Sequence, residues 1–217
     1  MFRRPLDSAS VVAKLKEVEA AFHADPGSFI EATEELKKDD FRLIGEIIQI
    51  YCIADYCGRR VIDSIREAAL GPQARNAGGL QDAQVLSKLK EAGQMLWYMS
   101  MKDAIIRAAD ILMMHSEIRH NFAHWAARKV RKQNVIVILS KNHIEGKRRH
   151  GLAGDPSNSN YGFLYVPALD EEVRKMREHI GNLSLAAYEL ENRIDEMRET
   201  FNERGMHPLK GTKSPNT

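Results

Sequence analysis

Titratable side chains gather in one short segment of the sequence, residues 115–125 (HSEIRHNFAHW), which holds three of the chain's eight histidines beside an arginine, an asparagine and a glutamate. Histidine exchanges protons near neutral pH because its ordinary pKa is about 6.5. Arginine stays charged, and its planar fork matches phosphate oxygens. The segment therefore has the groups for acid–base chemistry on a phosphate. The alternative is structural: Ile118, Phe122 and Trp125 keep helical spacing and would pack in a core, leaving the polar residues as a solvated helix end.

Two of these histidines also raise the question of a metal site. His120 and His124 are four residues apart and would project from one face of a helix, as paired zinc ligands do. No glutamate lies between them as in the HExxH pattern, and the spacing gives no third ligand. Cys52 and Cys57 belong to another predicted helix. We therefore expect neither a metal nor another cofactor.

The string from Arg119 to His124 (RHNFAH) resembles the signature of the HEPN superfamily, in which an arginine, a polar residue and a histidine lie at the end of a helix in an all-α bundle. It is especially similar to the RNxFAH of mannitol operon repressor-like proteins. The motif covers six residues, and the architectural resemblance covers about residues 40–200. The resemblance implies a helical bundle and a homodimer.

The resemblance also implies an activity. HEPN domains that are enzymes resemble metal-independent endoribonucleases, in which the RNA 2′-hydroxyl attacks the neighbouring phosphorus and leaves a 2′,3′-cyclic phosphate. His124 would then be the general acid or base and Arg119 the stabiliser of the pentavalent phosphorus, with His120 and Asn121 as secondary candidates. Mannitol repressor-like proteins imply an alternative, a non-catalytic regulatory or binding module. The sequence departs from the toxin-type HEPN proteins at Ala126, because those proteins often have a tyrosine two residues after the motif histidine.

Helix geometry constrains this site. Five residues along an α-helix turn the chain by about 500°, so Arg119 and His124 would diverge by roughly 140°. Two arrangements could bring them to one phosphate. Either the helix loosens after about His120, or two subunits combine their motifs across a two-fold axis. The dimers of the family favour the second arrangement.

The net charge of +2 conceals one basic segment, because residues 128–150 hold eight lysines and arginines against a single glutamate, a balance of +7. The segment begins four residues after His124, so it could bind an RNA backbone near the motif by counterion release. Alternatively, this basic segment is the solvated tip of a loop and binds nothing. The predicted substrate-binding residues are Arg128, Lys129, Arg131, Lys132, Lys147, Arg148 and Arg149.

Periodicity predicts the elements that position these residues. We expect helices over residues 8–22, 29–36, 39–69 and 81–93, then a helix that begins at a capping box of Ser100 and Asp103 and runs toward Ile118. Residues 134–140 and 161–166 are rich in β-branched and aromatic residues and predict a two-stranded hairpin with a long polar tip. Tyr161, Phe163 and Tyr165 alternate there, either packing on the bundle or stacking on bases.

The last helix, after Pro167, carries ten apolar residues at alternating steps of four and three. Such a stripe packs inside the chain's own bundle or forms a seam that binds a second copy or another partner helix, and both can hold at once. Its members are Leu169, Val173, Met176, Ile180, Leu183, Ala187, Leu190, Ile194, Met197 and Phe201. The predicted fold is therefore mainly all-α: about five helices with a hairpin inserted at about residues 131–167, in one domain over residues 1–204, followed by a disordered tail over 205–217.

Composition excludes other classes. Of 217 residues, 43% are hydrophobic and 29% charged, as in ordinary folded proteins. The longest apolar runs, such as residues 135–139, have five residues, far fewer than the roughly 18 residues of a membrane span. The first ten residues lack the apolar stretch of a signal peptide. We expect a cytoplasmic protein with no membrane partner, whose two cysteines are reduced and buried.

Overall fold

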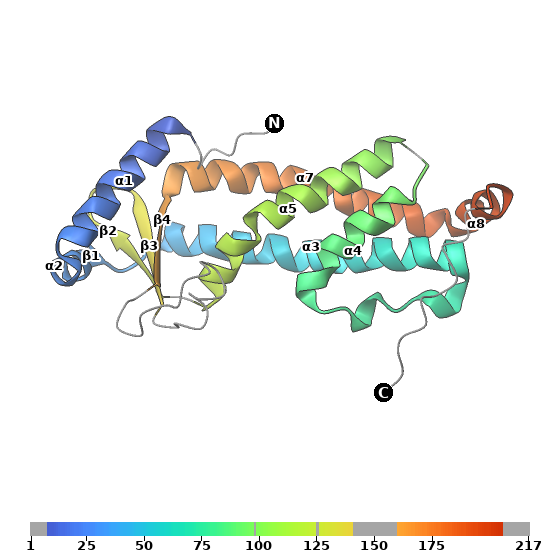
Figure 1. Cartoon of the computed structure of the whole chain (residues 1–217), viewed down its shortest axis with the longest axis horizontal. Coiled ribbons are helices and arrows are strands. Elements are labelled where there is room, and N and C mark those ends of the chain that lie inside the picture. Colours follow the sequence, from blue (N-terminus) through green and yellow to red (C-terminus); the bar gives the residue numbers. More distant parts are fainter. Residues whose placement is uncertain (1–7, 98, 125, 141–159, 206–217) are drawn as a thin grey trace. The chain divides into compact units, whose positions relative to one another are not determined.

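A computed structural model describes residues 8–97, 99–124, 126–140 and 160–205 (Figure 1). The chain is mostly helical with a small antiparallel sheet, which confirms the predicted fold class. The helices are α1 (Ala9–Ala24), α2 (Pro26–Glu31), α3 (Lys38–Leu70), α4 (Asp82–Gln94), α5 (Met99–His124), α7 (Val166–Asn192) and α8 (Ile194–Glu203). The strands are β1 (Thr33–Glu34), β2 (Ala126–Val130), β3 (Val135–Ser140) and β4 (Asn160–Tyr165).

The chain divides into two compact units, and each is described by itself. The first comprises Met1–Gln49 and Ser116–Lys175, and the second comprises Ile50–His115 and Met176–Thr217. Within the described residues, no helix combines the length and apolarity needed to cross a membrane.

The sheet of the first unit has four strands in the order β1-β2-β3-β4, all antiparallel. The expected two-stranded hairpin was therefore wrong in its number of strands. Val135, Ile136, Val137 and Ile138 of β3 are each at most 1% exposed, so this strand is covered on both faces. One edge of β3 pairs with β4 and the other with β2, which is the neighbouring strand that the prediction missed.

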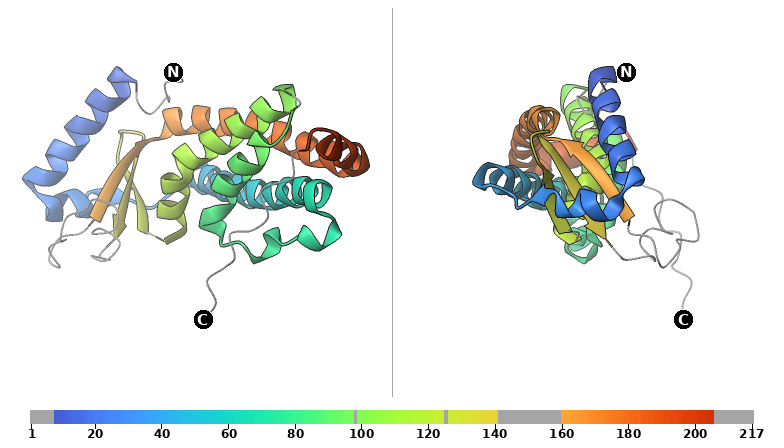
Figure 2. Two further views of the ribbon diagram at one scale, coloured as in Figure 1. Left: turned by 45° about the vertical axis from the view of Figure 1, so that its right-hand side comes forward. Right: turned by 90° about the vertical axis from the view of Figure 1, so that its left-hand side faces the viewer.

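Helix α1 covers one face of this sheet (Figure 2). Val18 packs against Val130, Val135 and Val137, and Phe163 and Tyr165 of β4 join the same cluster. The rings of Phe163 and Phe22 meet edge to face with centroids 5.8 Å apart. Of the two alternatives for the strand aromatics, packing within the protein is therefore shown for Phe163 and Tyr165. The side chain of Tyr161 lies outside what the structure describes.

The second predicted helix, over residues 29–36, begins and ends earlier than expected. Pro26 opens α2, and the Asp25 carboxylate caps it by accepting a hydrogen bond of 3.1 Å from the Ser28 backbone N–H. The helix ends at Glu31 because Thr33 and Glu34 pair with Val130 and Lys129 of β2. A long-range pairing, absent from the local pattern, thus shortens the helix.

The second unit is built from helices that pack side by side. The Tyr51 hydroxyl of α3 donates to the Leu112 carbonyl of α5 at 2.5 Å. Gly58 lets α4 approach α3 closely, since a Cβ at this position would lie 3.1 Å from the side chain of Val85. Cys57 is buried as predicted, whereas Cys52 is exposed, contrary to expectation.

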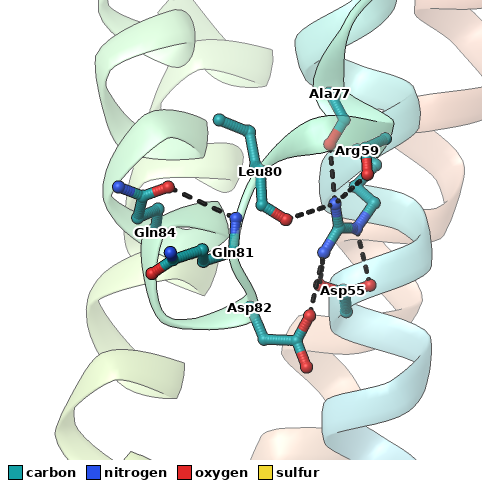
Figure 3. Close-up of polar contacts among 8 residues, drawn as sticks. Asp55, Arg59, Ala77, Leu80, Gln81, Asp82 and Gln84 are labelled. Atoms are coloured by element: carbon teal, nitrogen blue, oxygen red, sulfur yellow. Dashed lines mark hydrogen bonds and ion pairs between the residues drawn. The ribbon is translucent and has the colours of Figure 1, made fainter.

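Arg59 on α3 binds the segment that connects α3 to α4 (Figure 3). Its guanidinium donates to both carboxylate oxygens of Asp55, at 2.8 and 3.0 Å, and to Asp82 at 3.0 Å. It also donates to the carbonyls of Ala77 and Leu80, at 2.6 and 3.0 Å. The hydrogen bonds that Arg59 donates to Asp55 raise the pKa of Arg59. The predicted loop after residue 70 is therefore held in place by one partly buried cation.

Two helix ends differ from the prediction. Helix α5 begins at Met99, so Ser100 lies inside the helix and is not its cap. The capping box found in the structure opens α4, where Gln81 and Gln84 exchange hydrogen bonds with each other's backbone. The last helix breaks at Arg193, which has non-helical backbone angles and separates α7 from α8.

Nine of the ten stripe residues are buried in the chain, and Ile194 is partly buried. At its end the Trp97 ring meets the Phe201 ring edge to face with centroids 5.2 Å apart. Packing within the chain, the first alternative for this stripe, is therefore what the structure shows. A partner helix that used the same side chains would have to displace intramolecular neighbours.

Candidate functional site

The predicted motif lies on the last two turns of α5, which stays helical through His124. The helix therefore does not loosen between His120 and His124, and the first arrangement considered for the site is wrong. Ile118 and Phe122 are 8% and 9% exposed and anchor this end of the helix in the first unit. The structural alternative thus holds for these two residues, while the polar residues between them lie on the other sides of the helix. Trp125 lies outside the described residues.

His120 and His124 lie together on one face. Their ring centroids are 4.6 Å apart with an interplanar angle of 50°. His124 is exposed and His120 is partly buried, so a substrate could reach the His124 ring directly. His115, the third histidine of the segment, is 4% exposed and belongs to the core of the second unit.

Arg119 is partly buried and presents a spare donor. Its Nε is buried, and among the residues that the structure describes it has no hydrogen-bond partner. On a continuous helix Arg119 points about 140° away from His124, so one chain does not aim both groups at a single phosphate. Asn121 is partly buried on the same two turns.

The described residues contain no group of three or more histidine, cysteine, aspartate or glutamate side chains that could hold a metal ion. The pair of His120 and His124 therefore has no third ligand within the described part of the chain. What this pair can do chemically is exchange protons.

Two of the predicted substrate-binding residues make contacts inside the first unit. The Lys129 ammonium lies 2.6 Å from a carboxylate oxygen of Asp40, which is only 2% exposed. Arg128 Nε donates to the Thr33 hydroxyl oxygen at 2.8 Å. These contacts join β2 to β1 and to the beginning of α3. Sequence reasoning missed Asp40 as a partner of Lys129, because 89 residues separate the two and no local pattern links them.

Arg131 and Lys132 are exposed in the turn that joins β2 to β3. Ala126 pairs with Leu139 and Val130 pairs with Val135, so this turn lies at the end of β2 farther from His124. The five residues of β2 span about 15 Å. The turn and the motif are therefore separated by the length of the strand.

The remaining predicted basic residues, Lys147, Arg148 and Arg149, lie outside the described residues. Ser140 and Asn160, which flank that segment, pair with each other one step beyond the pair of Leu139 and Tyr161. Because Leu139 also pairs with Ala126, Ser140 and Asn160 lie at the end of the sheet nearer the motif. Of the described basic residues, Arg128 and Lys129 thus lie within β2, and Arg131 and Lys132 lie at the end of β2 away from the motif.

A buried carboxylate in the same unit was also missed. Glu172 on α7 is 1% exposed. The signal that could have found it is its spacing, since Glu172 lies three residues after Leu169 and four before Met176, both in the buried stripe.

His179, on α7 in the second unit, is partly buried. Burial lowers its pKa below the ordinary value; Glu178 opposes this shift, and Arg107 and His115 add to it. Its protonation is therefore disfavoured by the fold.

No family model matches this chain, and neither the curated proteins nor the solved structures provided a significant match.

Proposed function

We propose that the chain is a metal-independent endoribonuclease of HEPN type that cleaves single-stranded RNA. The observation that carries this proposal is Arg119, whose buried Nε has no hydrogen-bond partner among the described residues. Leaving such a donor unpaired costs free energy, so a movement of the Arg119 side chain that pairs this donor with an anionic ligand would be favourable. A phosphate of RNA is an anion that these groups can both bind and activate.

The proposed reaction needs a proton acceptor, a proton donor and a cation. The RNA 2′-oxygen attacks the adjacent phosphorus while its proton passes to a base, and the bond from phosphorus to the 5′-oxygen breaks as that oxygen receives a proton. The products are a 2′,3′-cyclic phosphate and a 5′-hydroxyl. His124 is the group that transfers a proton, because a substrate can reach its exposed ring. His120, whose ring lies beside it, is the second candidate. Arg119 stabilises the charge on phosphorus.

Since α5 directs Arg119 and His124 to different sides, we propose that the two groups at one phosphate come from two subunits. A two-fold axis near the motif would bring Arg119 of each chain to His124 of the other, with His120 beside His124 as the second acid–base candidate. Arg131 and Lys132, and beyond the described residues Lys147, Arg148 and Arg149, would bind the flanking backbone. We also propose that the chain acts in the cytoplasm.

A non-catalytic HEPN-like module that binds RNA or protein is the second candidate. The divergence of Arg119 and His124 on one continuous helix favours it, because binding does not require both groups to reach one phosphorus. This candidate predicts RNA affinity without cleavage.

The test incubates the full chain with mixed single-stranded RNA in excess chelator. The proposal predicts cleavage that persists in chelator and falls at least about 100-fold in His124→Ala, the usual cost of losing an acid–base group. His23→Ala, which removes an exposed histidine from α1, is the matched control and should cleave normally. Binding without cleavage would favour the second candidate, and the absence of both would reject the two together.

A further inference from the structure

Ser116 lies on α5 between Arg119 and the two histidines of the motif. It is three residues before Arg119 and four before His120, so an ideal helix places it about 60° from the first and about 40° from the second. All three residues belong to the first unit. Residues three and four apart are neighbours on a helix surface, with Cβ atoms about 5–6 Å apart. Ser116 is therefore adjacent to both Arg119 and His120.

The direction of helical side chains brings Arg119 and His120 toward Ser116. In an α-helix each long side chain points back toward the N-terminus and covers the turn before its own Cα. On α5 the rings of His120 and His124, which are four residues apart, have centroids 4.6 Å apart, so side chains at this spacing meet here. By the same geometry, Arg119 and His120 extend over the turn that contains Ser116.

The helix surface from Arg119 to His124 is open to a ligand. Around the helix axis, Ala123, Ser116 and His120 lie between these two residues, at about 40°, 60° and 100° from Arg119. Ala123 and Ser116 are exposed, and His120 is partly buried. None of the three is a large apolar side chain. A ligand that contacts Arg119 from this side therefore meets Ser116 before it reaches the histidines.

A serine at this position suits the binding of a phosphate. Its hydroxyl can donate a hydrogen bond to a phosphate oxygen, and hydrogen bonds to charged groups are stronger than those between neutral groups. Alanine has the higher helix propensity, and the exposed Ser116 fills no place in the core, so packing does not require serine here.

We propose that the Ser116 hydroxyl donates a hydrogen bond to a non-bridging oxygen of the RNA phosphate that Arg119 of the same chain binds. The inference rests on the proposed function and adds a substrate-binding residue to it. In the proposed dimer, one chain supplies Arg119 and Ser116 at each phosphate, and the other chain supplies His124.

Cleavage of a single-stranded RNA oligonucleotide in excess chelator tests the inference. The value of kcat/KM should fall about 10-fold in Ser116→Ala, the cost of one hydrogen bond to a charged group. Ser116→Thr should keep most of the wild-type value, because threonine retains the hydroxyl. Ser10→Ala, which removes an exposed hydroxyl from α1 in the same unit, is the matched control and should cleave normally. Thermal unfolding should show Ser116→Ala to be no less stable than the wild type.

The outcomes separate this inference from the proposed function. If the wild type cleaves and Ser116→Ala cleaves equally well, or Ser116→Thr is as impaired as Ser116→Ala, the inference is overturned and the proposed function stands. If the wild type does not cleave, the proposed function fails. The affinity for an oligonucleotide that is 2′-deoxy throughout then decides the inference: weaker binding by Ser116→Ala supports it, and equal binding by the two proteins overturns it.

Sulfur substitution at the cleaved phosphate tests the contact directly. Sulfur accepts hydrogen bonds more weakly than oxygen, so the wild type should cleave one of the two phosphorothioate diastereomers more slowly than the other. Ser116→Ala should reduce this preference, because the hydroxyl that distinguishes the two oxygens is gone. A ratio of the two cleavage rates that is the same in both proteins would overturn the inference.

Discussion

At the scale of single residues, the site combines side chains with different degrees of exposure. His124 is exposed, His120 and Arg119 are partly buried, and Ile118 and Phe122 fix the helix beneath them. Lys129 shows that a basic residue next to such a site can serve structure first, because its ammonium neutralises a carboxylate that water cannot reach.

Removing the Lys129 ammonium should lower the free energy of unfolding, because this ammonium pairs with Asp40 inside the first unit. Lys129→Met leaves the Asp40 charge buried without its cation, which costs about 3 kcal/mol in the free energy of unfolding. Urea denaturation of Lys129→Met, Asp40→Asn and the double variant checks this. The double variant should lose less stability than the sum of the single losses. If the stability losses of the two single variants were additive, Lys129 and Asp40 would not stabilise each other.

His179 should make stability depend on pH. Its pKa is lower in the folded than in the unfolded protein, so the unfolded chain binds the proton more readily and stability falls as the pH drops below about 6.5. The charged groups that act on it are Glu178, Arg107 and His115. Denaturation at pH 7.5 and pH 5.5 should show a smaller loss for His179→Gln than for the wild type. An equal loss in the variant would assign the pH dependence to other groups.

At the scale of elements, most of the chain forms long helices, and single side chains fix the short connections between them. Arg59 binds two carboxylates and two carbonyls, so Arg59→Met should cost about 2 kcal/mol and speed hydrogen exchange in the connection from α3 to α4. Arg75→Met removes an exposed arginine paired with Glu67 and should cost less than about 1 kcal/mol. If the two variants behaved alike, Arg59 would not be the residue that fixes this connection.

The long helices were predictable because their apolar spacing is a local property. Helix α3 was expected over residues 39–69 and is found at Lys38–Leu70, and α4 was expected over 81–93 and is found at Asp82–Gln94. Strands β1 and β2 were not predictable, since Thr33–Glu34 and Ala126–Val130 lack an apolar alternation and owe their form to pairing with distant segments. The break at Arg193 likewise interrupts an unbroken apolar stripe.

The candidate site was partly predictable for the same reason. The spacing of His120 and His124 fixed their shared face, and the divergence of Arg119 followed from helix geometry. The positions of Arg128, Lys129, Arg131 and Lys132 did not follow, because they depend on the register of β2 with β3 and on the ion pair of Lys129 with Asp40.

At the scale of the whole molecule, the proposed site is shared between chains. Arg119→Ala and His124→Ala should each be inactive alone, whereas a mixture refolded together should regain about a quarter of wild-type cleavage, from heterodimers that hold one intact composite site. Gel analysis of cleaved RNA measures this. No recovery in the mixture would place all the groups of a site in one chain.

The most direct test of the central claim is cleavage of a single-stranded RNA oligonucleotide in chelator by the wild type and by His124→Ala, with the product ends identified by mass spectrometry. The account predicts 2′,3′-cyclic phosphate and 5′-hydroxyl ends from the wild type, and no products when the residue at the cleaved bond is 2′-deoxy. Cleavage that survives the 2′-deoxy substitution, requires a metal ion, or is unchanged in His124→Ala would contradict it.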